Sequence, residues 1–362
     1  MSAAINVHAT NLAPTEDKTQ NGHSAQEHHD DQEHPPHPDD DKSPEEIRQA
    51  YEELRIEVEP TEAMIDPNVQ FEHPETFPAN DVGHDVLHNV ARHNKRTLAS
   101  FSMTNKVCVV TGAARGLGNM MARTMIESGA TQIVILDLRQ EECDKAVEDI
   151  QEWFEQEVLT PEERKKGLAS ELECIGVACD VSDEESVQAA FDTVKAKFGR
   201  CDCLITAAGI VENFIAEEYP TDKVKKLMDI NVMGTWYCAL KAKELMEDGG
   251  SMIFIGSMSG SPQTPYNFSK AAVRHMARSL AVEWALKKIR VNCISPGYML
   301  TNLTKVILDN DPVLRDTWIS KIPVGRMGDP SDLKGAIIYL ASDASKYTTG
   351  SEMVIDGGYT CV

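Results

Sequence analysis

Histidine is almost missing from the larger part of the chain. The sequence has 11 histidines, and only His275 lies beyond residue 100. Chemistry in residues 101–362 therefore cannot rest on a histidine cluster. No apolar run approaches the roughly 20 residues of a membrane span. The first residues also lack the basic start and apolar core of a secretory signal, and the character of a transit peptide. We expect no membrane partner and no export.

Paired cysteine spacings and an excess of positive charge are also absent. The nine cysteines show no repeated paired spacing, which predicts free thiols in a reducing compartment and hence a cytoplasmic protein. Lysine and arginine total 35 against 58 aspartates and glutamates, a net charge of −23. This charge argues against nucleic acid or an anionic membrane as a partner.

The acidic charge is concentrated in residues 1–100, which hold 21 acidic and 7 basic side chains, a net of −14. Large apolar side chains are scarce in residues 1–45, so this stretch cannot bury enough surface to offset its ordering entropy. We predict a largely disordered, acidic, His-rich extension over residues 1–100. Residues 27–41 could hold a metal weakly, but a solvated tail is favoured because nothing fixes ligand geometry. We therefore predict no metal site.

From residue 101 to residue 362 the pattern indicates one folded domain. Short apolar, β-rich runs alternate with longer helical stretches, as expected for a parallel sheet covered by helices on both faces. The predicted fold class is α/β, a doubly wound parallel sheet of the Rossmann kind. The predicted strands are residues 107–111, 132–136, 174–178, 203–206, 251–255, 291–294 and 353–356.

A glycine-rich turn, Thr111-Gly112-Ala113-Ala114-Arg115-Gly116-Leu117-Gly118, follows the first predicted strand and precedes a helix. Glycines allow the backbone to approach a pyrophosphate at a helix N-terminus. Asp137 ends the second strand, where a carboxylate accepts hydrogen bonds from the adenosine ribose and repels a 2′-phosphate. We therefore favour NAD over NADP, although Arg115 would suit a phosphate. Asp180, after the third strand, is equally well explained as a helix cap near Ser182.

With the sequence Tyr266-Asn267-Phe268-Ser269-Lys270, this turn resembles the short-chain dehydrogenase/reductase family in its single-domain branch. The similarity covers residues 101–362 and includes five further segments in the family's order. They are Asp180-Val181, Thr206-Ala207-Ala208-Gly209, Asn231-Val232-Met233-Gly234, Pro296-Gly297-Tyr298-Met299-Leu300-Thr301 and Asp356-Gly357-Gly358. The resemblance implies a dinucleotide bound by a common set of residues. These are Gly112, Arg115, Gly116, Leu117, Gly118, Asp137, Asp180, Val181, Ala207, Ala208, Gly209, Tyr266, Lys270, Pro296, Gly297 and Thr301.

Tyr266 and Lys270 are the expected proton-transfer pair. Four residues apart on a predicted helix from Pro265 to about Ala285, they project from one face. A phenol has a reference pKa near 10, and a nearby ammonium would lower it. The resemblance further implies that Ser257 binds the substrate oxygen and that Lys270 binds the nicotinamide ribose. It also implies that Asn231 holds a water that relays protons through Lys270.

Two departures from the family pattern bear on activity. Thr206 replaces the first asparagine of the family's Asn-Asn-Ala-Gly segment. Ser257 precedes Tyr266 by only nine positions, so the pocket loop is short, and Ser259 or Ser261 could serve in place of Ser257. Nine extended residues still span roughly 30 Å, so closure is possible.

Residues 257–286 and the segment after the sixth strand resemble a fungal polyol branch of the family, which includes sorbose and xylulose reductases and mannitol and arabinitol dehydrogenases. A polyol, ketose or other ketone substrate is therefore expected, along with a homodimer or homotetramer. Two alternatives stay open. One is a ketone reductase of secondary metabolism, and the other is a cofactor-binding protein whose catalysis is impaired by the short loop.

Overall fold

The computed structural model describes residues 97–258, 263–301, 304, 308 and 312–362. All of them belong to one compact unit, Val82–Val362, and the other unit, Met1–Asp81, lies outside the described residues. The predicted acidic extension, including the stretch 27–41 for which a solvated tail is favoured over a metal site, therefore lies outside the described residues except for residues 97–100. Within the described part of the chain, no helix is both long and apolar enough to span a membrane.

Parallel strands form the centre of the unit, in the spatial order β3-β2-β1-β4-β5-β6-β7. The seven predicted strands are confirmed, with ends that differ by at most two residues. The strands are β1 (Val107–Thr111), β2 (Gln132–Asp137), β3 (Glu173–Ala178), β4 (Cys203–Thr206), β5 (Gly250–Ile255), β6 (Ile289–Pro296) and β7 (Glu352–Ile355). The chain leaves β1 toward β2 on one side and returns to β4 on the other. The carboxyl ends of β1 and β4 therefore frame the crevice where ligands bind in open α/β sheets.

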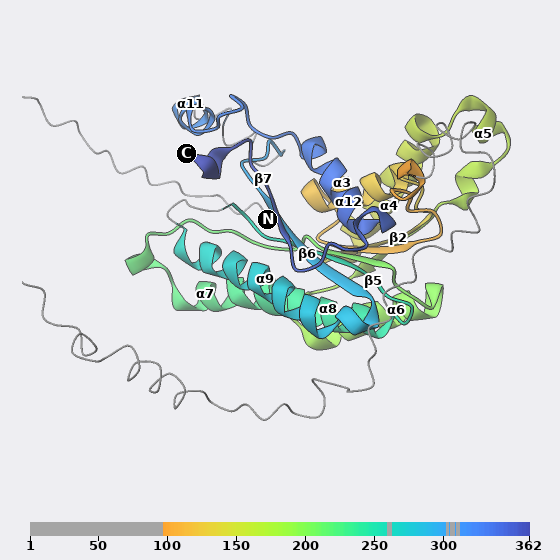
Figure 1. Cartoon of the computed structure of the whole chain (residues 1–362), viewed down its shortest axis with the longest axis horizontal. Helices are drawn as coiled ribbons and strands as arrows, with labels where there is room; N and C mark the ends of the chain where they lie inside the picture. The colour runs from red at the N-terminus through yellow and green to blue at the C-terminus, as the bar shows by residue number, and fades with distance from the viewer. Residues whose placement is uncertain (1–96, 259–262, 302–303, 305–307, 309–311) are drawn as a thin grey trace, which may run out of the picture. The chain divides into compact units, whose positions relative to one another are not determined.

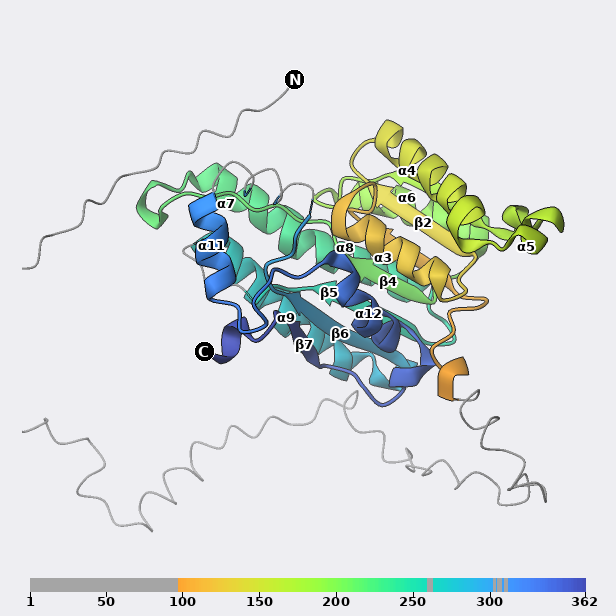
Figure 2. The same cartoon turned by 90° about the horizontal axis from the view of Figure 1, so that it is seen from above.

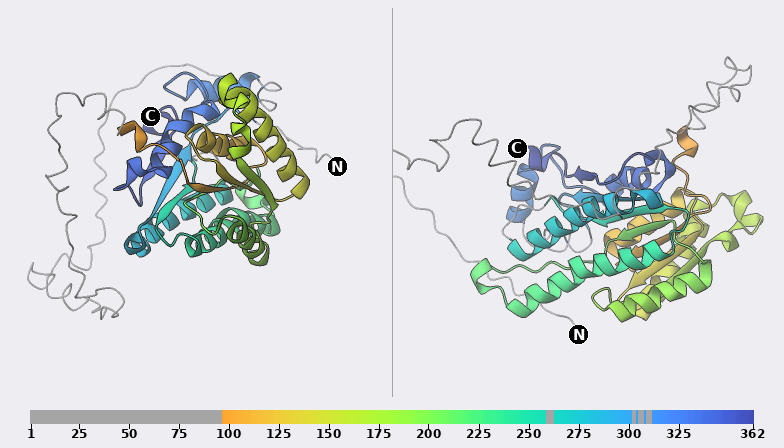
Figure 3. Two further views of the ribbon diagram at one scale, coloured as in Figure 1. Left: turned by 90° about the vertical axis from the view of Figure 1, so that its right-hand side faces the viewer. Right: turned by 60° about the horizontal axis from the view of Figure 1, so that its bottom comes forward.

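Helices cover both faces of this sheet, as Figures 1 and 3 show, and Figure 2 views the same layers from above. One face packs against α3, α4 and α12, and the other against α6, α8 and α9. The helices are α3 (Gly116–Glu127), α4 (Gln140–Trp153), α5 (Pro161–Lys165), α6 (Glu184–Phe198), α7 (Thr221–Met228), α8 (Gly234–Glu244), α9 (Thr264–Glu283), α11 (Pro312–Ser320) and α12 (Lys334–Ala341). The short segments are η2 (Phe154–Val158), η3 (Leu168–Glu171), η4 (Ala216–Glu218), η5 (Asp229–Met233), η6 (Ala285–Lys287), η7 (Pro330–Leu333), η8 (Asp343–Ser345) and η9 (Tyr359–Cys361).

Each face of the sheet has its own apolar core, because successive side chains along a strand point to opposite faces. Val110 and Ile135 face α3, α4 and α12, whereas Val109 and Val134 face α6, α8 and α9. Each central strand is therefore apolar on both faces, which is the pattern of a sheet buried between helical layers. The predicted doubly wound α/β fold is confirmed.

Candidate active site

The helix α9 carries Tyr266 and Lys270 on the face that meets the sheet. It begins at Thr264, one residue before the predicted start, with Pro265 in its first turn. Lys270 is buried and Tyr266 is partly buried. Ser257 follows β5 and forms a side-chain hydrogen bond with Tyr266. The structure therefore brings together three side chains that the sequence separates by up to 13 positions.

Lys270 is held beside the phenol ring by a backbone carbonyl. Its Nζ donates a 2.8 Å hydrogen bond to the carbonyl of Ile255, the last residue of β5. The same nitrogen lies 5.7 Å from the centroid of the Tyr266 ring. Burial lowers the pKa of Lys270 to about 8, because the charged ammonium loses its hydration. The amine can therefore gain or lose a proton close to neutral pH.

The pKa of Tyr266 differs from the expectation that a nearby ammonium lowers it. Burial raises the pKa of Tyr266 above its ordinary value, and the hydrogen bond with Ser257 opposes that rise. The ammonium does not lower the pKa of Tyr266 because Lys270 points it at the Ile255 carbonyl. In this arrangement the phenol is a proton donor, suited to delivering a proton to a carbonyl oxygen.

Asn231 lies in the π-helical segment η5, which joins α7 to α8 without interrupting the helix. Its side chain is buried and spans two segments. Oδ1 accepts a hydrogen bond from the Ile210 amide at 2.9 Å, while Nδ2 donates to the Ile210 carbonyl at 3.0 Å and to Ser269 Oγ at 3.1 Å. Asn231 therefore fixes the loop after β4 against the helix that carries Tyr266. π-Helical insertions are frequent at functional sites.

The glycine-rich turn requires its glycines for three different physical reasons. Gly112 has φ +64°, and a Cβ there would lie 2.7 Å from the Ala208 backbone. A Cβ on Gly118 would lie 2.3 Å from the Gly112 carbonyl. Gly116 has φ +64°, yet among the described residues no atom lies within 4 Å of its would-be Cβ. The turn is therefore packed tightly on its inner side and open at Gly116, a shape that admits a phosphate.

Helix α3 begins at this opening, and the described residues include no side chain that caps its first turn. Its first amides are thus available to an anionic ligand. Asp137 braces the turn from β2, because its carboxylate accepts hydrogen bonds from the Ala114 amide at 3.0 Å and the Leu138 amide at 2.8 Å. The exposed Arg115 lies 4.0 Å from Glu142. Together these residues fit the adenosine and pyrophosphate parts of a dinucleotide.

A cavity of about 340 Å³ opens between the carboxyl ends of β4, β5 and β6. A Cβ on Gly209 would lie 3.2 Å from Asn231 Oδ1 and 3.6 Å from Lys270 Nζ, so the backbone passes close to both. The predicted site residues that line the cavity are Leu117, Ala207, Gly209, Ser257, Tyr266, Lys270, Pro296, Gly297 and Thr301.

Other predicted residues lie outside this lining. One carboxylate oxygen of Asp180 accepts hydrogen bonds from the Ser182 amide and hydroxyl, at 3.0 and 2.6 Å, in a local turn. The alternative of a helix cap is wrong for Asp180, because the N-cap of α6 is Asp183. Val181 is buried against Gly234. Ser259 and Ser261 lie outside the described residues.

The sequence alone did not identify several residues of the cavity. Ile210, Val211, Met258, Gln263, Thr304 and Trp318 all line it. The usable signal for Gln263 was its closeness in sequence to Tyr266, because it lies before the predicted helix start at Pro265 and is the N-cap of α9 in the structure. Trp318 carried none, since it reaches the cavity from α11 by stacking on Tyr298 at a centroid distance of 4.4 Å.

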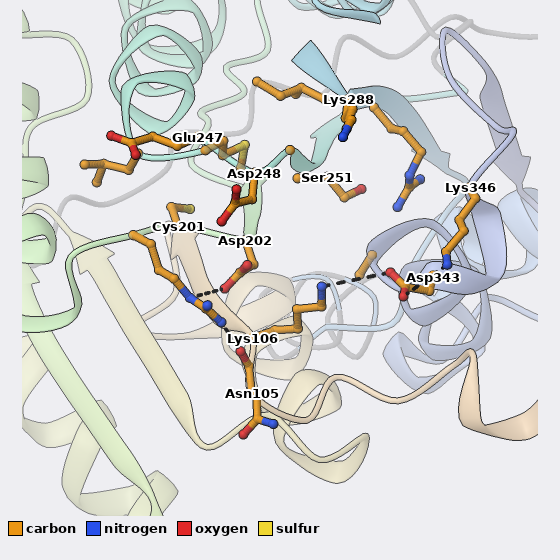
Figure 4. A pocket seen from close by; sticks show the side chains of 18 of the residues that line it. Asn105, Lys106, Cys201, Asp202, Glu247, Asp248, Ser251, Lys288, Asp343 and Lys346 are labelled. Carbon is orange, nitrogen blue, oxygen red and sulfur yellow. Dashed lines mark hydrogen bonds and ion pairs between the residues drawn. The ribbon is translucent and has the colours of Figure 1, made fainter. Parts of the chain in front are cut away.

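A larger cavity, of about 1140 Å³, lies at the opposite, amino-terminal ends of β4, β5 and β6 (Figure 4). Three of its five described lining cations are paired with carboxylates, whereas Arg290 donates to backbone carbonyls and Lys288 is exposed. Arg200 lies 3.0 Å from Asp202, whereas Lys106 and Lys346 lie 3.9 and 3.5 Å from Asp343. None of the predicted site residues lines this cavity. The smaller cavity is therefore the candidate active site.

Comparisons with known proteins agree with this geometry. The family model described as enoyl-(acyl carrier protein) reductase matches residues 112–360. The ribulose-forming D-arabinitol 2-dehydrogenase of Candida tropicalis is 40% identical over 273 residues, 72% of this chain and 95% of the relative. The NADH-dependent L-xylulose reductase of Ambrosiozyma monospora is 36% identical over 275 residues, 73% and 98% of the two chains. A solved gluconate 5-dehydrogenase from Burkholderia cenocepacia J2315, in complex with NADP and tartrate, has a TM-score of 0.65 at 30% identity and covers 73% of this chain and 99% of its own.

Proposed function

Because the chain belongs to the short-chain dehydrogenase/reductase family, we propose that it transfers a hydride between a nicotinamide dinucleotide and a polyol–ketose pair. One observation carries this proposal. The Ser257 and Tyr266 side chains meet beside buried Lys270 in a cavity at the crevice between the carboxyl ends of the strands. The relatives that act on arabinitol and xylulose support the substrate class.

We assign the proton-transfer roles to four side chains. Tyr266 donates a proton to the substrate oxygen in reduction and takes it back in oxidation, while Ser257 holds that oxygen by a hydrogen bond. Lys270 returns a proton to Tyr266, and Asn231 fixes the loop and holds the water that supplies Lys270. The bound nicotinamide supplies or accepts the hydride. The raised pKa of Tyr266 suits proton donation, and the lowered pKa of Lys270 suits proton exchange.

We propose that the dinucleotide lies along the carboxyl edge of the sheet, from the glycine-rich turn to the cavity. The cofactor is of the NAD or NADP type, and we favour NAD because the Asp137 carboxylate at the end of β2 would repel a 2′-phosphate. Glu142 offsets the opposing influence of Arg115, from which it lies 4.0 Å. The residues assigned to the dinucleotide are Gly112, Arg115, Gly116, Leu117, Gly118, Asp137, Asp180, Val181, Ala207, Ala208, Gly209, Tyr266, Lys270, Pro296, Gly297 and Thr301.

We further propose a homodimer or homotetramer in the cytoplasm. Val282 near the end of α9 is 79% exposed, Leu286 in the following segment η6 is 82% exposed, and Phe268 near the start of α9 is 42% exposed. Large apolar side chains in such positions favour burial against a second copy. Sedimentation of the full-length chain tests this part of the proposal.

The activity itself is tested by NADH consumption with D-ribulose, L-sorbose and D-fructose, and by repeating the assay with NADPH. We expect turnover of at least one ketose, with NADH preferred. Binding of NADH, seen as a fluorescence change, without turnover across these ketoses and a wider ketone panel would instead support the alternative of a cofactor-binding protein impaired in catalysis.

A further inference from the structure

The walls of the active-site cavity are mainly apolar beyond the proton-transfer residues. Ile210, Val211, Met258, Met299 and Trp318 all line it. A polyol or ketose carries a hydroxyl on nearly every carbon, and each hydroxyl loses its hydration when it enters such a cavity. Polar side chains must therefore meet those hydroxyls if the substrate is to bind.

Gln263 is a polar side chain in this lining, and it takes an unusual position for its type. It occupies the N-cap of α9, where short side chains usually accept hydrogen bonds from the first helical amides. Within the described residues, the Gln263 side chain does not cap the helix. Its amide nitrogen instead donates a hydrogen bond to Asn213 Oδ1. The side chain is thus directed to another segment, the loop that follows β4.

The loop that carries Asn213 is fixed on both sides of that residue. Glu212 pairs with Lys223 of α7 at 3.0 Å. Lys223 also lies 4.6 Å from the centroid of the Phe214 ring, which packs on Tyr219 at 4.9 Å. Residues 207–215, between β4 and η4, form no regular secondary structure, so these contacts give the Asn213 amide a defined position. A preorganised polar group loses less entropy when it binds a ligand.

We infer that Gln263, held in place by Asn213, forms a subsite for a hydroxyl group of an uncharged polyhydroxy substrate, at a position away from the reacting carbon. This inference rests on the proposed function. A primary amide offers two donor hydrogens and an acceptor oxygen, and a hydroxyl group is both donor and acceptor. The Gln263 amide, which lines the cavity, can therefore bind such a hydroxyl while Asn213 holds its nitrogen.

The charge of the cavity supports an uncharged substrate. Among its described lining residues, Lys270 is the only cationic side chain, and its Nζ is engaged by the Ile255 carbonyl. A sugar acid would need an arginine or lysine to bind its carboxylate after desolvation. Amides select for hydroxyl groups without favouring a carboxylate.

The test compares Gln263→Leu and Asn213→Leu with the wild-type, full-length enzyme. With D-ribulose and NADH, we expect Gln263→Leu to raise KM about tenfold for one lost hydrogen bond. Asn213→Leu removes the partner that holds Gln263 and should raise KM by a smaller factor, and kcat should stay within about threefold of wild type in both variants. With butanedione, a ketone that has no hydroxyl group, both variants should match the wild type. Gln151→Leu is the matched control, because Gln151 is exposed on α4 and remote from the cavity.

A fall in kcat without a rise in KM would overturn the subsite, because it would mean that the amide pair only positions Tyr266. Unchanged ketose kinetics in both variants would overturn it as well. So would a wild-type preference for 5-ketogluconate over D-ribulose. These results all leave an active wild-type enzyme, whereas a wild type that turns over no ketose refutes the proposed function first.

Discussion

The two ends of the sheet hold cavities of opposite character. At the amino-terminal ends, the cavity of about 1140 Å³ has five lining cations among the described residues. Three of them lie within 4 Å of carboxylates, such as Arg200 beside Asp202, while Arg290 donates to backbone carbonyls and Lys288 is exposed. At the carboxyl ends, the cavity of about 340 Å³ contains Lys270, which has no carboxylate within 4 Å among the described residues. The cations of the larger cavity are thus ion-paired, exposed or bound by several hydrogen bonds, whereas Lys270 is buried beside the Ile255 carbonyl.

This difference identifies the functional end better than size does. An ion pair at the surface contributes little to stability, and its two charges already neutralise each other, so it does not need a charged ligand. A buried amine without a counter-ion is costly, and its pKa falls, here to about 8. Perturbed groups of this kind cluster at functional sites. The topology agrees, because ligands bind at the carboxyl ends of open parallel sheets.

The largest expected difference between the two cavities is tested by removing one phenol hydroxyl from the lining of each cavity. Tyr266→Phe should lower kcat about a thousandfold, because general acid catalysis contributes roughly 10²- to 10⁴-fold. Tyr347→Phe removes a hydroxyl from the lining of the larger cavity and should leave kcat unchanged. Initial rates with the best ketose measure both. Equal losses in the two variants, or an active Tyr266→Phe enzyme, would invalidate the assignment of the site.

A second effect follows from the pKa of Lys270. Below about pH 8 the amine is protonated, and above it the amine is increasingly neutral. Because the neutral amine cannot return a proton to Tyr266, the rate of ketose reduction should fall about tenfold per pH unit above 8. Initial rates between pH 6 and 10 measure this. Lys346→Gln, at the other end of the sheet, should leave the profile unaltered. A rate that stays level to pH 10 would exclude Lys270 from the proton path.

A third test compares two aspartates that both accept backbone hydrogen bonds. Asp137 accepts from Ala114 at the carboxyl end, and Asp202 accepts from the Val107 amide at 2.8 Å at the amino end. Asp137→Asn removes the charge that would repel a 2′-phosphate, so the NADPH-to-NADH ratio of kcat/KM should rise about tenfold. Fluorescence titration with each nucleotide checks the same ratio without turnover.

Asp202→Asn should leave that ratio at the wild-type value, since Asp202 lies beside Arg200 in the other cavity. If the two variants shift nucleotide preference equally, then Asp137 does not determine it. A wild-type enzyme that prefers NADPH would contradict the choice of NAD directly.

The fold could be predicted because its determinants are local in the sequence. Strand β4, for example, has the predicted bounds, since a short β-rich run between turn residues has few other structures open to it. The spacing of Tyr266 and Lys270 similarly predicts one helix face. These patterns depend on the repeat of side-chain directions along a helix or strand. Residues far away in the chain do not change that repeat.

Contacts between remote segments could not be predicted in this way. The side chain of Asn231, in the π-helical segment, is hydrogen-bonded to the Ile210 backbone, and the partner of Gln263 is the side chain of Asn213. Lys270 donates to Ile255 rather than facing the phenol oxygen alone. Each of these interactions is settled by packing between elements, so neither spacing nor residue type reveals it.

Thr206 provides the smallest test, on stability rather than activity. Its hydroxyl is buried at the end of β4, and within the described residues it has no hydrogen-bond partner. Thr206→Val should therefore raise the free energy of unfolding by about 1 kcal/mol, because a methyl group carries no desolvation cost. Thr124→Val is the matched control, since the buried Thr124 hydroxyl donates to the Met120 carbonyl at 2.8 Å, and it should lower stability by a similar amount. Thermal unfolding measures both changes. A destabilised Thr206→Val protein would contradict the prediction. It would mean that the hydroxyl has a bound partner, such as an ordered water, at the edge of the crevice.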